Sequence, residues 1–143
     1  MAYFEWTDDL DTGIPVIDNQ HKRIVEYINR LHDAVANNQD RATVQEILDE
    51  VVDYTLTHFT FEEEMLEIIE YPGLRGHQQM HRAFSQRIQE HQRAFASGDD
   101  IAGQLAQTLR DWLFNHIRED DHQYGPVVRD WLLAHAPNGV IAR

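Results

Sequence analysis

Four long segments with apolar residues at steps of three and four are the feature that most restricts how this 143-residue chain can fold. That spacing follows the 3.6-residue turn of the α-helix, so each segment should present one apolar stripe. Polar or Pro/Gly-containing connections separate the four segments, which we place at about residues 19–37, 41–70, 77–95 and 101–124. Long helices joined by short connections favour an all-α fold, an antiparallel up-down-up-down four-helix bundle.

The segments outside the four stripes indicate how the bundle begins and ends. Residues 1–18 lack helical periodicity, so we expect an N-terminal arm laid over the bundle, with Asp18 as N-cap of the first helix. Glycine and proline at 124–126 should end the fourth helix, and a short C-terminal helix, Val127–Ala134, should pack outside. We therefore predict a single domain, 1–143, with its arm at 1–18, its bundle at 19–124 and an extension at 125–143.

Composition excludes several kinds of partner and ligand. The 12 Lys and Arg face 25 Asp and Glu, and the net charge of -13 would repel a phosphate backbone, so no nucleic acid is expected. The chain has no cysteine, so a metal would need nitrogen and oxygen ligands. No apolar run approaches the ~20 residues of a membrane span, and the N-terminus lacks a signal-peptide pattern. We expect a cytoplasmic protein without membrane insertion.

Six ionisable residues interrupt the apolar stripes of the four helices. They are His21, His58, Glu62, His77, His81 and His116. One inward histidine is usually a hydrogen-bonded core residue, but six such groups would each cost ~1–3 kcal/mol if left unsatisfied. The pairs His58/Glu62 and His77/His81 have i,i+4 spacing, so each pair projects from one helix face a turn apart. This arrangement favours a metal site in the core.

The fourth helix offers two candidate carboxylates after His116. Asp120 has the i,i+4 spacing, whereas Asp121 at i,i+5 stands about 140° around an ideal helix. Spacing alone favours Asp120.

These residues resemble the motifs of the hemerythrin family. The resemblance includes His21 after Asp-Asn-Gln, His-Phe-x-x-Glu-Glu from His58, a Tyr-Pro pair, His-x-x-x-His from His77, and Trp-Leu-x-x-His-Ile-x-x-x-Asp from Trp112. It covers residues 6 to 126 and is strongest to the single-domain bacterial members. The resemblance implies reversible O2 binding at a non-heme di-iron centre.

The resemblance also implies a full ligand set for two iron ions that share an oxo or hydroxo bridge. The family's aspartate stands five residues after the histidine, which selects Asp121 over Asp120, and a widened turn of the π type would permit that spacing. One ion would be bound by His77, His81 and His116, the other by His21 and His58, with Glu62 and Asp121 bridging both. The second ion has one protein ligand fewer, so O2 is expected to bind there.

Four apolar residues next to these ligands are expected to wall the O2 pocket and exclude water: Phe59, Trp112, Leu113 and Ile117. Ordinary core packing explains the same residues, and one side chain can do both. Other polar residues are expected not to bind metal. They are His32, His91, His122 and His135, the acidic run Glu63, Glu64, Glu67 and Glu70 on a solvated face, and the Glu119-x-x-His122 motif.

The function expected from the sequence is O2 storage, delivery or sensing without catalysis, with an oxygen-consuming enzyme or a signalling protein as candidate partner. A di-iron oxidase, or an enzyme that handles peroxide or nitric oxide, remains an alternative on the same bundle. Zinc or manganese in the same cage is a third, because nitrogen and oxygen ligands alone do not select iron.

Overall fold

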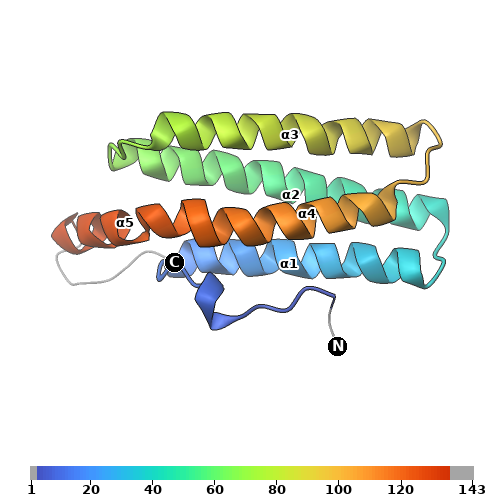
Figure 1. Cartoon of the computed structure of the whole chain (residues 1–143), viewed down its shortest axis with the longest axis horizontal. Coiled ribbons are helices and arrows are strands. Elements are labelled where there is room, and N and C mark those ends of the chain that lie inside the picture. Colours follow the sequence, from blue (N-terminus) through green and yellow to red (C-terminus); the bar gives the residue numbers. More distant parts are fainter. Residues whose placement is uncertain (1–2, 136–143) are drawn as a thin grey trace.

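The computed structural model describes residues 3–135, apart from the side chain of Asp120, and all regular structure in this range is helical. Four long helices run side by side in alternating directions (Figure 1), which confirms the predicted bundle. They are α1 (Pro15–Ala36), α2 (Arg41–Ile68), α3 (Leu74–Ala96) and α4 (Ala102–His116). The chain continues from α4 through a π-helical turn, η2 (Ile117–Asp121), into α5 (His122–His135), and the arm carries a 3-10 turn, η1 (Asp8–Leu10). None of the described helices is long and apolar enough to span a membrane.

Two hydrophobic clusters fill the bundle. The larger one contains inward residues of all four long helices, such as Ile28, Leu48, Ile88 and Leu105, each 0% exposed. A smaller cluster at the α5 end consists of Ile14, Ile17, Leu66, Tyr124 and Val128. In α1, His21 lies between Ile17 of the smaller cluster and Ile24 of the larger one, and in α2 Glu62 lies between Phe59 and Leu66, so the predicted metal ligands form a polar layer between the two clusters.

The first helix begins earlier than predicted, and the assignment of Asp18 as its N-cap is wrong. Helix α1 starts at Pro15, whose fixed φ suits the first helical position, and Asp18 lies within the first turn. Its buried carboxylate accepts hydrogen bonds from the backbone N–H and the hydroxyl of Thr12, at 2.8 and 2.7 Å, and from the N–H of Gly13 at 3.2 Å. Asp18 therefore ties the arm to the helix instead of capping it.

The predicted helix end at residues 124–126 is also wrong. Pro126 lies inside α5, and on either side of it Tyr124 and Val128 are buried with Ile14, Ile17 and Leu66. Burial of these side chains outweighs the low helix propensity of the Gly-Pro pair. The predicted boundary between bundle and extension falls within α5, and residues 136–143 of the extension lie outside the described residues.

Gly125 is expected to be intolerant of any side chain. A Cβ atom there would lie 2.9 Å from the carbonyl oxygen of Thr12, a backbone atom that cannot turn aside. Gly125→Ala should lower the free energy of unfolding by about 1–3 kcal/mol, since overpacking forces the arm away from α5. The helical Gly76 is the control because nothing lies within 4 Å of its Cβ position, and Gly76→Ala should stabilise the protein by up to about 1 kcal/mol. Urea unfolding of both variants tests this, and equal effects would contradict it.

Candidate metal centre

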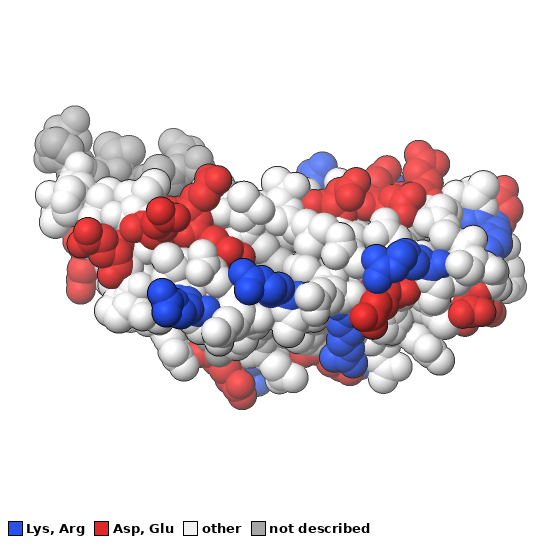
Figure 2. Space-filling model, turned by 90° about the horizontal axis from the view of Figure 1, so that it is seen from above, with Lys and Arg blue, Asp and Glu red and all other residues white. Residues whose placement is uncertain are grey.

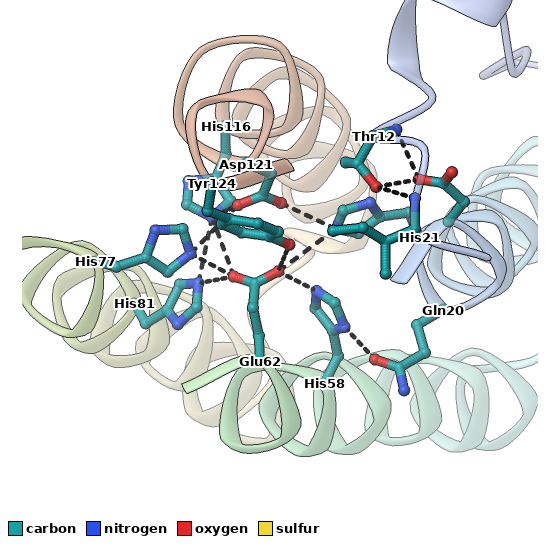
Figure 3. Close-up of polar contacts among 12 residues, drawn as sticks. Thr12, Gln20, His21, His58, Glu62, His77, His81, His116, Asp121 and Tyr124 are labelled. Carbon is teal, nitrogen blue, oxygen red and sulfur yellow. Dashed lines mark hydrogen bonds and ion pairs between the residues drawn. The ribbon is translucent and has the colours of Figure 1, made fainter. Parts of the chain in front are cut away.

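The structure brings together all seven residues expected from the sequence (Figure 3), each 0–4% exposed. Helix α1 supplies His21, α2 supplies His58 and Glu62, α3 supplies His77 and His81, α4 ends with His116, and η2 ends with Asp121. Within this set, two groups have potential ligand atoms that all lie within 4.8 Å of one another. One group is Glu62, His77, His81 and His116; the other is His21, His58, Glu62 and Asp121.

The two oxygens of Glu62 are divided between the groups. Its Oε1 lies 3.1 Å from Nε2 of His81 and also contacts Nε2 of His77. Its Oε2 lies 3.3 Å from Nε2 of His58 and 3.8 Å from Nε2 of His21. The carboxylate therefore faces histidines on both sides.

The two carboxylate oxygens of Asp121 also face different groups of histidines. Its Oδ1 lies 3.1 Å from Nε2 of His116 and 3.2 Å from Nε2 of His77, whereas its Oδ2 lies 2.9 Å from Nε2 of His21. The π-helical turn Ile117–Asp121 makes this possible, because its i→i+5 hydrogen bonds return a residue five positions on to the same face. The widened turn predicted for Asp121 is thus confirmed. The side chain of Asp120 is outside the described part of the structure.

Several buried polar atoms of this cluster have no hydrogen-bond partner. They include both ring nitrogens of His21, Nε2 of His58 and both oxygens of Asp121. These atoms approach one another closely without hydrogen-bond geometry, and leaving them unsatisfied costs about 1–3 kcal/mol each. Imidazole nitrogens and carboxylate oxygens are suitable ligands for iron, zinc and manganese. The residues present fit a pair of metal ions.

Three further side chains, none of them predicted from the sequence to belong to the site, hold the cluster in place. As oriented, Gln20 Oε1 accepts from Nδ1 of His58 at 2.6 Å, which leaves Nε2 of that histidine directed at the centre. Glu63 Oε2 lies 2.9 Å from Nδ1 of His81, and Tyr124 donates its hydroxyl to Glu62 Oε2 at 2.8 Å. Such partners orient metal-binding side chains.

The sequence held a signal for each of these three. Gln20 precedes His21, Glu63 follows Glu62 within the quoted motif, and Tyr124 stands one helical turn after Asp121. Glu63 is 27% exposed, so it contacts both the solvent and buried His81.

The pKa values reflect how strongly the buried groups interact. Burial by itself lowers the pKa of His77, but close contacts with the carboxylates of Asp121 and Glu62 outweigh it and raise that pKa to about 9. Burial would raise the pKa of Glu62, yet close contacts with the surrounding histidines hold it well below its usual value. The carboxylates thus favour positive charge beside them, and metal ions would displace protons on binding.

Aromatic rings cover the three-histidine side. Phe59 stacks on His81 with centroids 3.8 Å apart, and Trp112 stacks on His116 at 4.3 Å. Leu113 and Ile117 are buried in the larger cluster, 2% and 0% exposed. The role of these four residues as an O2 pocket stays a prediction.

The histidines expected not to bind metal belong to neither group. His32 stacks on Tyr3, His135 stacks on Trp131, and Nδ1 of His91 bonds the carbonyl of Arg87 at 2.8 Å. His122, in the Glu-x-x-His motif, also lies outside both groups.

Comparison with known proteins agrees with this geometry. Residues 12–128 match the family model of the hemerythrin HHE cation binding domain. Bacteriohemerythrin from Pseudomonas aeruginosa (strain PAO1) is 50% identical over 90% of this chain and 84% of its own length. Bacteriohemerythrin from Methylococcus capsulatus is 32% identical over 88% of this chain and 97% of its own, and myohemerythrin from Theromyzon tessulatum is 27% identical over 85% and 90%.

Solved structures give the same result. The crystal structure of a wild-type hemerythrin superposes with a TM-score of 0.84 at 31% identity, over 89% of this chain and 98% of the other. A mutant of hemerythrin superposes with a TM-score of 0.85 at the same identity, over 90% and 98%. The bundle, the buried layer of histidines and shared carboxylates, and the match over residues 12–128 together make this chain a member of the hemerythrin family.

Proposed function

We propose that this protein binds O2 reversibly at a pair of iron ions and serves in oxygen storage, delivery or sensing. The observation that carries the proposal is the division of both carboxylates between two groups of histidines. A single ion would need only one oxygen from each carboxylate, whereas two adjacent ions would each take one. In this assignment His77, His81 and His116 would hold one ion, His21 and His58 would hold the other, and Glu62 and Asp121 would be shared by both.

The iron pair supplies the redox chemistry that O2 binding requires, and the protein supplies the geometry and the dry surroundings. Three imidazoles on one side and two on the other make the sites unequal, so O2 would bind on the two-histidine side, which offers fewer protein ligands. The imidazole orientations are fixed by Gln20 on His58 and by Glu63 on His81. Buried Phe59, Leu113 and Ile117 exclude water from the layer.

An absorption experiment tests the proposal. We expect two irons per chain by metal analysis, and a visible charge-transfer band that appears in air, disappears under argon and returns through repeated cycles. Steady O2 consumption with an added reductant, without a reversible band, would instead support a di-iron oxidase. Zinc or manganese in the protein as isolated from cells, with iron absent, would contradict the iron assignment.

Tyr124 is expected to position Glu62. Tyr124→Phe keeps the ring but removes the hydroxyl donor to Glu62 Oε2, so the free energy of unfolding should fall by about 1–3 kcal/mol and iron should be lost faster to a chelator. Tyr54→Phe is the control because Tyr54 lies in α2 among apolar residues of the larger cluster. Iron release followed by absorbance measures the difference. Equal release rates in the two variants would show that the hydrogen bond has no role in holding the metal.

A further inference from the structure

Helix α3 carries charge of the opposite sign to the rest of the protein. It contains four arginines and one glutamate, whereas the whole chain has a net charge of -13. The neighbouring helix α2 contains eight acidic residues and one arginine. This separation of charge would orient an approaching protein, because α3 attracts an acidic surface and α2 repels it.

Three of these arginines form a straight row. Arg75, Arg82 and Arg93 are exposed and are separated by 7 and 11 residues, close to whole numbers of helical turns, so they share one face. At a rise of 1.5 Å per residue the row is about 27 Å long. Figure 2 views the molecule from the α3 side and shows blue groups spread along its length, with a red group among them and red areas toward both edges. We call these three residues the arginine row.

The arginine row is not neutralised within the described part of the chain. No described carboxylate forms an ion pair with any of its three guanidinium groups, or with Arg87 on the same helix. Other arginines are paired: Arg30 with Glu50, Arg110 with Asp111 and Arg118 with Asp9. The charge of the row is therefore available to a partner.

The arginine row borders the candidate metal centre. Arg82 directly follows His81, and both line a recess of about 270 Å³ between α2 and α3. Glu63 lines the same recess and, 27% exposed, connects Nδ1 of buried His81 to the surface. Only the side chain of His81 would separate a protein bound over Arg82 from the candidate metal centre.

We propose that the arginine row is the docking surface for an acidic electron-carrier protein that reduces the iron centre. The proposal rests on the proposed function, because ferrous iron in contact with O2 is gradually oxidised and must be reduced to bind O2 again. Each encounter transfers one electron from the reduced carrier and converts one ferric ion to ferrous, so two encounters restore the pair.

The charges favour a protein over a nucleic acid as occupant. DNA carries one charge per about 1.7 Å, which would extend far beyond the row and meet the acidic residues of α2. A small protein can present a single acidic patch to α3, and electron-transfer contacts of this kind are small and transient.

A plant-type [2Fe–2S] ferredoxin of negative net charge is the probe. The row variant is Arg75→Glu with Arg82→Glu and Arg93→Glu. The matched control reverses three exposed cations of α1, Lys22→Glu, Arg23→Glu and Arg30→Glu, and has the same net charge. The rate at which reduced ferredoxin reduces the aerobically oxidised, iron-loaded protein is measured by stopped flow. It is compared at about 0.01 M and about 1 M salt, where the Debye length is about 30 and about 3 Å.

We expect the row variant to lose at least about 10-fold in this rate at low salt and the control less than about 3-fold, with the difference vanishing at high salt. Reduction by dithionite should be the same in all three proteins, which shows that the centre is intact. Equal losses in row variant and control would overturn the proposal. Binding of a single-stranded oligonucleotide through the row, with no row-dependent ferredoxin effect, would also overturn it.

A second readout separates this proposal from the proposed function. Titration calorimetry with oxidised ferredoxin measures docking without reference to iron. If the protein holds no iron but binds ferredoxin through the row in a salt-dependent way, the proposed function fails while the docking surface stands. If iron and reversible O2 binding are found but ferredoxin binding does not depend on the row, only the docking surface fails.

Discussion

Asp121→Ala is expected to abolish binding of both iron ions. The two oxygens of Asp121 face opposite groups, Oδ1 toward His116 and His77 and Oδ2 toward His21, so truncation removes a ligand from each side. Loss of one residue that merely orients a ligand already costs 10–100-fold in metal affinity, and loss of a shared ligand should cost more. Iron per chain after desalting should fall to the level of protein that was never given iron.

Two further variants make this result specific. Asp121→Asn keeps the shape but lowers the negative charge, and it should retain little iron. Asp120→Ala removes the carboxylate that ideal helix spacing favoured, and it should retain both ions and an unchanged spectrum. The reverse outcome, with Asp120→Ala losing the iron and Asp121→Ala keeping it, would refute the ligand assignment. Thermal unfolding by circular dichroism shows whether each variant is folded before its iron is counted.

Leu113→Asn is expected to shorten the lifetime of the oxygenated protein by at least about 10-fold, which corresponds to about 1.4 kcal/mol. Leu113 is 2% exposed and lies three residues before His116, so a polar side chain there would admit water and protons to the O2 site. Decay of the reversible absorption band in air measures the lifetime.

Leu109→Asn is the matched control for this prediction. Leu109 is 1% exposed on the same helix, one turn farther from His116, so its replacement should cost similar stability without wetting the site. If the two variants lose the band at the same rate, general destabilisation explains the effect and Leu113 has no special part in excluding water. A longer lifetime in Leu113→Asn than in the unchanged protein would refute the prediction directly.

Local periodicity was sufficient for the fold and for most of the candidate site. A helix fixes the direction of each side chain relative to its neighbours, so the apolar stripes determined the inward faces and the pairs His58/Glu62 and His77/His81 followed from i,i+4 spacing. The second helix ends at Ile68, just before the Tyr-Pro-Gly connection, as expected for a proline that cannot continue a helix. These features depend on residues close together in the chain.

The features that only the tertiary structure decided depend on contacts between distant residues. Spacing on an ideal helix favoured Asp120 and only the family resemblance selected Asp121; the structure shows the widened turn that places the Asp121 carboxylate between histidines of α1 and α3. Helix α5 continues through the Gly-Pro pair because Gly125 lets it pack against Thr12 of the arm, which no pattern within residues 122–135 reveals.

The partners of the ligands were hidden for the same reason. Gln20 and His58 are 38 positions apart, and Tyr124 and Glu62 are 62 positions apart. By itself, the sequence determined which side chains face inward, because that direction is a property of each single helix. Which buried donor meets which acceptor was decided only by the packing of the helices, because that pairing depends on the distances and rotations between them.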